Sequence, residues 1–305
     1  PEQGEDVLAI GDTFLEGRTP ARAGLLFDWN NWWALELASG PSKDMDYLKT
    51  VSLYYETLYR QNIPVDILPY GADLSSYDLI LAPMLYMEKE NAAERLREFV
   101  KKGGTLITTV MSGLADENDR CVFGAYPGKL KEMLGIWVEE TDALRPYEKN
   151  RMRLTDNLRL TEKEYDCGFL CDIIHPEGGA EALASYKDDF YAGTPCVTRN
   201  FFGKGRAYYI GTQPEQRFLE ELVSHICNEC GLQPLYPSSE GVELCLRVSD
   251  KAKTVFAINH NKTEAWVDFG PQKLTGLTDK KSLTGRIIIA PGDVLTAKIE
   301  TENNA

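Results

Sequence analysis

The 305-residue sequence has no apolar run near the roughly 20 residues that a membrane-spanning helix needs. It also has no surplus of basic residues: 47 Asp and Glu outnumber 33 Lys and Arg, and the formal net charge is -14. Because this charge repels phosphate groups, nucleic acids and anionic membranes are poor partners. With 43% hydrophobic residues, the chain is nevertheless typical of a globular protein rather than a disordered one.

Histidine is scarce, and its few positions count against a serine–histidine catalytic site. His175, His225 and His260 are scattered along the chain. Ser112-Gly113 follows a predicted strand, where a nucleophile would lie in an α/β hydrolase. The glycine that precedes the nucleophile in the elbow motif is missing, so the pattern does not predict a nucleophile.

Other ligand-binding patterns are incomplete. Gly203 and Gly205 lack the Lys-Ser/Thr ending and the following helix of a phosphate-binding loop, and they predict a hairpin turn instead. Neighbouring acids such as Glu139-Glu140 and Asp188-Asp189 are typical of solvated surface rather than of the carboxylate pair that glycoside hydrolysis needs.

Seven cysteines, an odd number in a long chain, indicate reduced thiols in a cytosolic protein. Cys227 and Cys230 form a CxxC pair, but no second Cys/His pair at a suitable spacing accompanies them. They share one apolar face of a predicted helix, while Cys167 and Cys171 lie in a strand-like segment. We therefore predict core thiols, and neither a metal nor a cofactor.

Residues 22–109 alternate between short apolar strands and amphipathic helices. This succession predicts an open parallel α/β sheet covered by helices on both faces. Residues 136–213 are predicted to be mostly strands and turns, and a helix at 214–230 closes the domain. The expected strands of the parallel sheet are 22–29, 64–70, 77–83 and 105–110, and its helices are 44–62 and 89–104.

The composition changes near residues 234–239. Residues 240–305 contain 9 acids and 9 bases, whereas residues 1–239 contain 38 acids and 24 bases. Short alternating strands follow the change, with no pattern as long as a helix. We predict an antiparallel sandwich or barrel from about residue 240, whose core is faced by Val242, Leu244, Leu246 and Val248.

The stretch DWNNWWA, which begins at Asp28, places three tryptophans directly after the short apolar run of residues 23–27. We expect it to form a loop. In a doubly wound sheet of order 2-1-3-4, the loops after strands 1 and 3 flank the crevice at the carboxyl edge. Trp32 and Trp33 could instead pack on the domain's own first helix. The residues expected to gather at that edge are Asp28, Trp29, Asn30, Pro83, Met84, Tyr86, Met111 and Ser112.

The chain resembles family-42 glycoside hydrolases, the bacterial β-galactosidases, from about residue 20 to about 298. The earlier part resembles the segment after that family's catalytic barrel, in LLFDWNNWWALE, YYETLYRQNIPVDIL, LSSYDLILAPMLYM, VKKGGTLITTVMSGLADEND and PGKLKEMLGIWVEETDAL. The later part resembles the family in GTPCVTRNFFGKGRAYYIGT, GVELCLRV and FAINHN. Any one segment is a weak signal, and their common order makes the resemblance specific.

The resemblance implies a flavodoxin-like (class I glutamine amidotransferase-like) α/β domain followed by a small antiparallel β domain. We expect residues 1–20 to be a linker from an N-terminal TIM barrel, 21–236 the trimerisation domain and 240–305 the β domain. In that family the barrel carries both catalytic glutamates. The Asn-Glu pair in this sequence, Asn228-Glu229, lies in a helical context that does not match, so no catalytic residue is assigned.

The implied function is a non-catalytic assembly or scaffold region of a cytoplasmic bacterial β-galactosidase, whose parent reaction is the hydrolysis of terminal β-D-galactosides by a retaining mechanism. Its partners would be its own TIM barrel and a homotrimer, with a galactoside bound only by the intact enzyme. The sequence starts at Pro1, without an initiator Met, as expected for a piece of a longer polypeptide. Candidates for the mouth of the parent active site or for a subunit interface are Asp28, Trp29, Asn30, Trp32, Pro83, Met84, Tyr86 and Ser112.

Two alternatives belong to other function classes. One is an independent amidotransferase-like hydrolase, which the absence of a recognisable Cys or Ser nucleophile counts against. The other is a carbohydrate-binding module, since tryptophan faces suit sugar rings, although one aromatic stretch seldom makes a complete sugar site.

The first prediction concerns activity. We expect this chain alone not to hydrolyse a chromogenic β-galactoside, because both required carboxylates belong to the barrel. A panel of simple esters and amides, assayed alongside, tests the hydrolase alternative. Turnover above the buffer blank that is lost on mutating an acidic residue of this chain would contradict the expectation.

Overall fold

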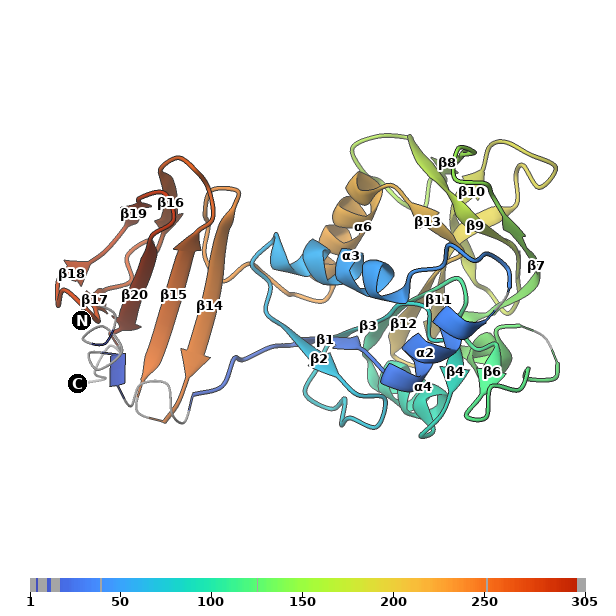
Figure 1. Cartoon of the computed structure of the whole chain (residues 1–305), viewed down its shortest axis with the longest axis horizontal. Coiled ribbons are helices and arrows are strands. Elements are labelled where there is room, and N and C mark those ends of the chain that lie inside the picture. Colours follow the sequence, from blue (N-terminus) through green and yellow to red (C-terminus); the bar gives the residue numbers. More distant parts are fainter. Residues whose placement is uncertain are drawn as a thin grey trace. The chain divides into compact units, whose positions relative to one another are not determined.

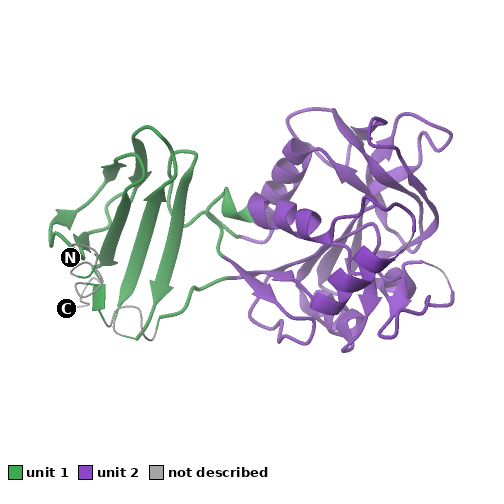
Figure 2. Ribbon diagram, in the orientation of Figure 1, with its two compact units in different colours: residues 1–21, 58–64, 232–305 green, residues 22–57, 65–231 purple. Residues whose placement is uncertain are grey.

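The computed structural model describes residues 4, 10–11, 17–38, 40–124, 126–250 and 252–300. The chain forms two compact units, coloured separately in Figure 2. Unit 1 contains residues 1–21, 58–64 and 232–305, and unit 2 contains residues 22–57 and 65–231. Most of the predicted linker at 1–20 lies outside the described residues.

Five parallel strands form the centre of unit 2, in the order β2-β1-β3-β5-β12. The predicted order 2-1-3-4 of the first four strands is confirmed. β1 and β3 are short runs of fully buried residues, as expected for parallel strands that are covered on both faces. The bounds are β1 Ala23–Leu26, β2 Val65–Leu68, β3 Leu79–Ala82, β5 Thr105–Thr109 and β12 Gly205–Ile210.

The sheet continues beyond β12 with antiparallel strands, so it is mixed rather than purely parallel. These strands come from the region predicted to be mostly strands and turns, and the full path is β13-β9-β8-β10-β11-β12-β5-β3-β1-β2, with β7 paired to β9. Phe202 pairs with Gly205 at the β11–β12 hairpin, which confirms the predicted turn. The bounds are β7 Ile136–Ala143, β8 Asn150–Leu154, β9 Glu164–Pro176, β10 Glu181–Tyr186, β11 Pro195–Phe202 and β13 Thr212–Pro214.

Helices cover both faces of this sheet, as Figure 1 shows with α3 and α6 on one face and α4 on the other. In α4 the acidic Glu94 lies in the first turn and Lys101 and Lys102 in the last, which suits the helix dipole, and Gly103 caps the end. The bounds are α3 Tyr47–Tyr59, α4 Ala92–Lys102, the short η2 Gly128–Leu130 and α5 Lys131–Leu134, and α6 Gln216–Glu229.

The tryptophan-rich stretch is a helix, α2 (Trp29–Leu37), and the prediction of a loop there was wrong. The preceding strand also ends earlier than predicted, at Leu26. Asp28 explains why a helix begins here. Its backbone is extended, and its side-chain oxygen caps the first turn by accepting from the backbone amide of Asn31. The helix has little amphipathic character, so the hydrophobic pattern gave no signal for it.

Unit 1 contains two antiparallel sheets that share one core, as predicted for the region after residue 240. Val242 and Leu244 are buried in that core, Leu246 packs against it partly buried, and Val248 is half-buried. One sheet has the order β14-β15-β20-β17-β18 and the other pairs β16 with β19. The bounds are β14 Val242–Val248, β15 Lys253–Asn259, β16 Ala265–Asp268, β17 Leu274–Gly276, β18 Ser282–Leu283, β19 Arg286–Ile289 and β20 Val294–Ile299.

The predicted core thiols are largely confirmed. Cys167, Cys171 and Cys227 are buried, whereas Cys230 is half-buried at the end of α6. Burial raises the pKa of the Cys227 thiol to about 12, which makes it a poor nucleophile. Among the described residues, no group of His, Cys, Asp and Glu could hold a metal ion, and no helix is long and apolar enough to cross a membrane.

Candidate functional site at the carboxyl edge of the parallel sheet

Three segments meet where β1, β3 and β5 end. They are the start of α2, residues 83–91 and residues 110–113. Short strands β4 (Met87–Glu88) and β6 (Ala115–Asp116) pair in parallel just beyond the edge. The three segments are brought together because parallel strands direct their carboxyl ends to the same side of a sheet.

Asp28 joins the first two segments. One carboxylate oxygen caps α2, and the other lies 2.7 Å from the ammonium nitrogen of Lys89. Both side chains are only 13% exposed, so this ion pair is shielded from solvent more than an ordinary surface pair. The polar atoms of Asp28 are therefore already engaged within the domain.

Asn31 makes the second connection, and its side chain is fully buried. Its amide nitrogen donates to the carbonyl oxygen of Met84 at 3.0 Å, and its side-chain oxygen accepts from the backbone amide of Met87 at 2.9 Å. One carboxamide thus satisfies a donor and an acceptor of the turn after β3. Asn30, the neighbouring residue that was predicted to belong to the site, is exposed.

Hydroxyl groups from β5 and from the residues directly after it hold the other side of the same turn. Ser112 accepts from the backbone amide of Leu85 at 3.0 Å and lies 2.9 Å from the hydroxyl of Thr108. Thr109 accepts from the amide of Met84 at 2.8 Å. Ser112 is fully buried, so its hydroxyl serves the turn and is not presented to a substrate.

Backbone conformation at the turns is unusual. Met84 and Met111 both have positive φ, at 46° and 67°, in the left-handed region that side chains other than glycine seldom adopt. The hydrogen bonds around each turn offset the conformational cost. Tyr86 is half-buried and donates to Asp119 at 2.8 Å, which ties the turn to the loop after β6.

In contrast to these internal polar contacts, the outer face of α2 is apolar. Trp29 is 57% exposed, Trp33 53% and Leu37 85%, and their spacing of four residues places them along one side of the helix. We call these three residues the indole face. Trp32 is half-buried and donates to Glu36, and Phe27 makes an edge contact with Trp29 at 5.3 Å between ring centroids.

The structure therefore divides the predicted site residues into two groups. Asp28, Met84 and Ser112 belong to the buried network, together with Asn31, which was not among the predicted residues. Pro83 and Met111 are buried beside them. Trp29 and Asn30 are exposed, and Trp32 and Tyr86 lie between the two groups.

A buried carboxyl group lies behind this edge and was also missed. Asp172 on β9 is fully buried and accepts from Thr141 and Tyr209, each at 2.5 Å, and from Tyr126 at 3.2 Å. Tyr126 also accepts from the amide of Met111, so the network reaches the turn after β5. Burial outweighs the hydroxyl hydrogen bonds and raises the Asp172 pKa from 3.8 to about 7.

Comparison with known sequences identifies relatives over nearly the whole chain. Residues 21–233 match the family model described as the β-galactosidase trimerisation domain. The chain is 41% identical over 297 residues to the β-galactosidase BgaA of Planococcus sp. (strain 'SOS Orange'), covering 97% of this chain and 44% of that protein. It is 40% identical over 277 residues to the β-galactosidase LacA of Lactobacillus acidophilus, covering 90% and 40%.

Solved β-galactosidase structures are also similar to this chain over nearly its whole length. A β-galactosidase from Bacillus circulans sp. alkalophilus gives a TM-score of 0.94 at 41% identity, over 98% of this chain and 44% of that one. A β-galactosidase from Rahnella sp. R3 gives 0.84 at 36% identity, over 93% and 42%. The chain thus spans less than half the length of these relatives.

The buried carboxamide generates one prediction. Asn31→Ala leaves the Met84 carbonyl and the Met87 amide without their partner, so we expect a loss of about 2–4 kcal/mol in the free energy of unfolding. Asn30→Ala is the matched control, since the neighbouring side chain is exposed, and it should change stability by less than about 0.5 kcal/mol. Urea unfolding measures both, and equal effects of the two substitutions would refute the role of Asn31.

Asp172 generates a prediction about pH. Its folded pKa of about 7 exceeds its usual 3.8, so the folded state retains a proton that the unfolded state releases. The contribution of this group to the free energy of unfolding is therefore fully present below about pH 4. It falls as the pH rises to about 7, by on the order of 4 kcal/mol. Asp172→Asn removes the titration, so its urea midpoint should vary less over that window. The same slope for both proteins would contradict the assignment.

Proposed function

The chain belongs to the family of the β-galactosidase trimerisation domain, and from this membership we propose that it is the non-catalytic assembly region of a larger β-galactosidase. The relatives that it matches are more than twice as long. We propose that the parent enzyme hydrolyses terminal β-D-galactosides with retention of configuration, in the bacterial cytoplasm. Its catalytic glutamates would lie in a barrel outside this chain.

The proposed domains have the boundaries expected from the sequence. Residues 21–236 are the trimerisation domain, and residues 240–305 are the β domain. We assign the first a flavodoxin-like architecture. The order β2-β1-β3-β5-β12 supports that assignment, because five parallel strands in this order are the arrangement of flavodoxin-type sheets.

The indole face is the observation that carries the assembly proposal. The polar groups at the carboxyl edge are engaged inside the domain, whereas Trp29 and Trp33 are each more than half exposed. Covering one such indole stabilises a complex by about 3 kcal/mol at roughly 25 cal/mol per Å². Adjacent exposed indoles are typical of the centre of a protein interface rather than of free surface.

We propose that the indole face is covered by another copy of the chain in the homotrimer, next to the mouth of the parent active site. Asn30 and Trp32 would lie at the same contact. Asp28, Pro83, Met84, Tyr86 and Ser112 would hold the supporting turns in place. The galactoside would reach this region only in the intact enzyme.

Self-association tests the proposal. We expect light scattering to give a molecular mass above that of the monomer for the chain at high concentration. Trp29→Ser combined with Trp33→Ser should shift the equilibrium toward the monomer by at least about 100-fold, which is the effect of losing only one of the two indole contacts, roughly 3 kcal/mol. Phe190→Ser is the control, because Phe190 is 73% exposed and far from α2 in sequence.

Two outcomes would count against the proposal. A chain that stays monomeric at high concentration would show that this region alone does not assemble. An equal shift from Phe190→Ser would show that exposed aromatic residues act without specificity. Circular dichroism of each variant checks that the fold is retained.

A further inference from the structure

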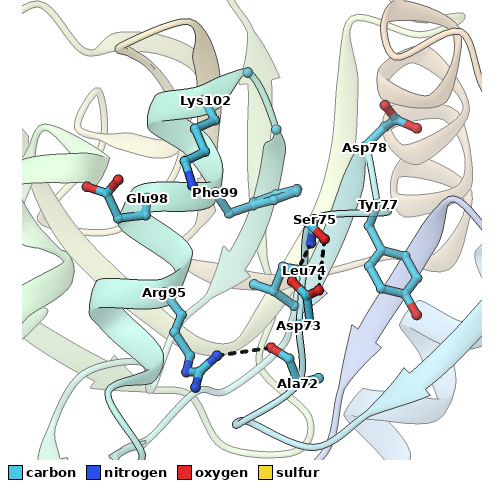
Figure 3. A pocket seen from close by; sticks show the side chains of 12 residues that line it. Ala72, Asp73, Leu74, Ser75, Tyr77, Asp78, Arg95, Glu98, Phe99 and Lys102 are labelled. Atoms are coloured by element: carbon cyan, nitrogen blue, oxygen red, sulfur yellow. Dashed lines mark hydrogen bonds between the residues drawn. The ribbon is translucent and has the colours of Figure 1, made fainter.

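A hollow lies at the opposite edge of the parallel sheet. It has a volume of about 440 Å³ and opens between α4 and residues 72–78, as Figure 3 shows. Residues 78 and 104 immediately precede β3 and β5, so the hollow is at the amino edge, away from the indole face at the carboxyl edge. Its lining residues are Ala72, Asp73, Leu74, Ser75, Tyr77, Asp78, Arg95, Glu98, Phe99, Lys102, Gly103 and Gly104.

The acidic residues of this hollow already have partners. Asp73 accepts from the amide and the hydroxyl of Ser75, at 3.0 and 2.9 Å. Asp78 is paired with Arg22 at 2.5 Å. These contacts hold the negative charges and reduce their need for a further cation.

Glu98 is the third acid, and it lies 3.8 Å from the ammonium nitrogen of Lys101 on the same helix. This pair is exposed and contributes little to stability. It nevertheless places a positive charge beside the Glu98 carboxylate, so none of the three lining acids is left without a donor or a cation.

The two basic residues are less well satisfied. Arg95 makes one long hydrogen bond, 3.4 Å from its guanidinium to the carbonyl oxygen of Ala72. Lys102 makes no hydrogen bond or close ion pair with the residues that the structure describes, although its charge and that of Arg95 both act on the Asp73 carboxylate. They are seven residues apart on α4, about 10 Å along the axis, so both face the hollow from one side of the helix.

The C-terminal end of α4, which lies beside the hollow, repels a negative ligand only weakly. Helix carbonyls that lack partners would repel an anion, but here the carbonyls of Phe99 and Val100 accept from the amides of Gly103 and Gly104. The carbonyl of Lys101 accepts from Lys204. The C-terminal turn is therefore capped within the domain.

An apolar floor completes the hollow. Leu74 and Phe99 are buried, and the ring of Phe99 lies against Gly104, where an added Cβ would come within 2.3 Å of it. The floor provides a surface for a carbon skeleton, and it lowers the local dielectric beneath the rim, where Arg95 and Lys102 stand beside Asp73, Asp78 and Glu98. The volume lies in the range of small-molecule sites, roughly 300–1,000 Å³.

We propose that this hollow binds a small organic anion, with a phosphate or carboxylate group held by Arg95 and Lys102 and its carbon skeleton against Leu74 and Phe99. Arg95 supplies the planar donor pair that such groups accept from, and Lys102 supplies the second charge. The site is independent of assembly through the indole face. It operates by local charge, in a chain whose net charge is -14.

Titration calorimetry with phenyl phosphate tests the site, with inorganic phosphate as the probe that lacks a carbon skeleton. At low ionic strength we expect phenyl phosphate to bind with a dissociation constant of about 1 mM, and inorganic phosphate several-fold more weakly. Benzoate distinguishes a carboxylate ligand from a phosphate ligand. Sodium chloride at matched ionic strength corrects for general screening.

Substitutions locate the binding. Arg95→Gln combined with Lys102→Gln should weaken phenyl phosphate by at least about tenfold, equivalent to 1.4 kcal/mol. Lys43→Gln combined with Lys163→Gln is the matched control, because it removes two charges from exposed positions that do not line the hollow, and its affinity should stay within about twofold.

Two results would overturn the proposal. One is no heat of binding for any probe at about 20 mM, a concentration well above the expected constant. The other is equal weakening by the control and by the variant of Arg95 and Lys102, which would mean nonspecific attraction. Light scattering of the variant of Arg95 and Lys102 separates this test from that of assembly, since its self-association should be unchanged.

Discussion

Parallel pairing of β1, β3 and β5 is the constraint on which the rest of unit 2 depends. It brings three segments that are far apart in the sequence to one edge, and the connections leading into β3 and β5 to the other. The first edge then needs polar side chains to satisfy its sharp turns, because buried backbone groups cannot go without partners. Asn31, Thr109 and Ser112 supply them.

The sequence was sufficient to predict the order of the first four strands, since each is a short apolar run between turn residues. It did not predict that the sheet continues through β11, β10 and β8, because antiparallel pairing of distant segments leaves no local pattern. Asn31 was missed for a different reason. Asn31 points inward and Asn30 outward only because the segment is helical. The hydrophobic pattern of α2 is too weak to predict that helix. Asp172 could have been found, as a single acid within the apolar strand segment LCDII.

Polar and apolar groups at the carboxyl edge are arranged in the reverse of the pattern expected at an active site. An active site exposes polar groups in a hollow and has apolar walls. Here the polar side chains are buried and mutually bonded, while large apolar rings face outward on α2. Such an edge presents apolar surface for contact and keeps its polar side chains inside the domain. This arrangement is the physical support for the proposal that the chain contributes to assembly rather than to chemistry.

The clustering of indoles on α2 also has a spectroscopic consequence. Trp29, Trp32 and Trp33 are three of the five tryptophans in the chain, and none of the three is fully buried. Tryptophan emission shifts to shorter wavelength when water leaves the ring, so three of the five emitting side chains report on the surroundings of α2. The protein therefore carries an intrinsic optical reporter at the surface where a subunit would bind, and no label needs to be added to follow that event.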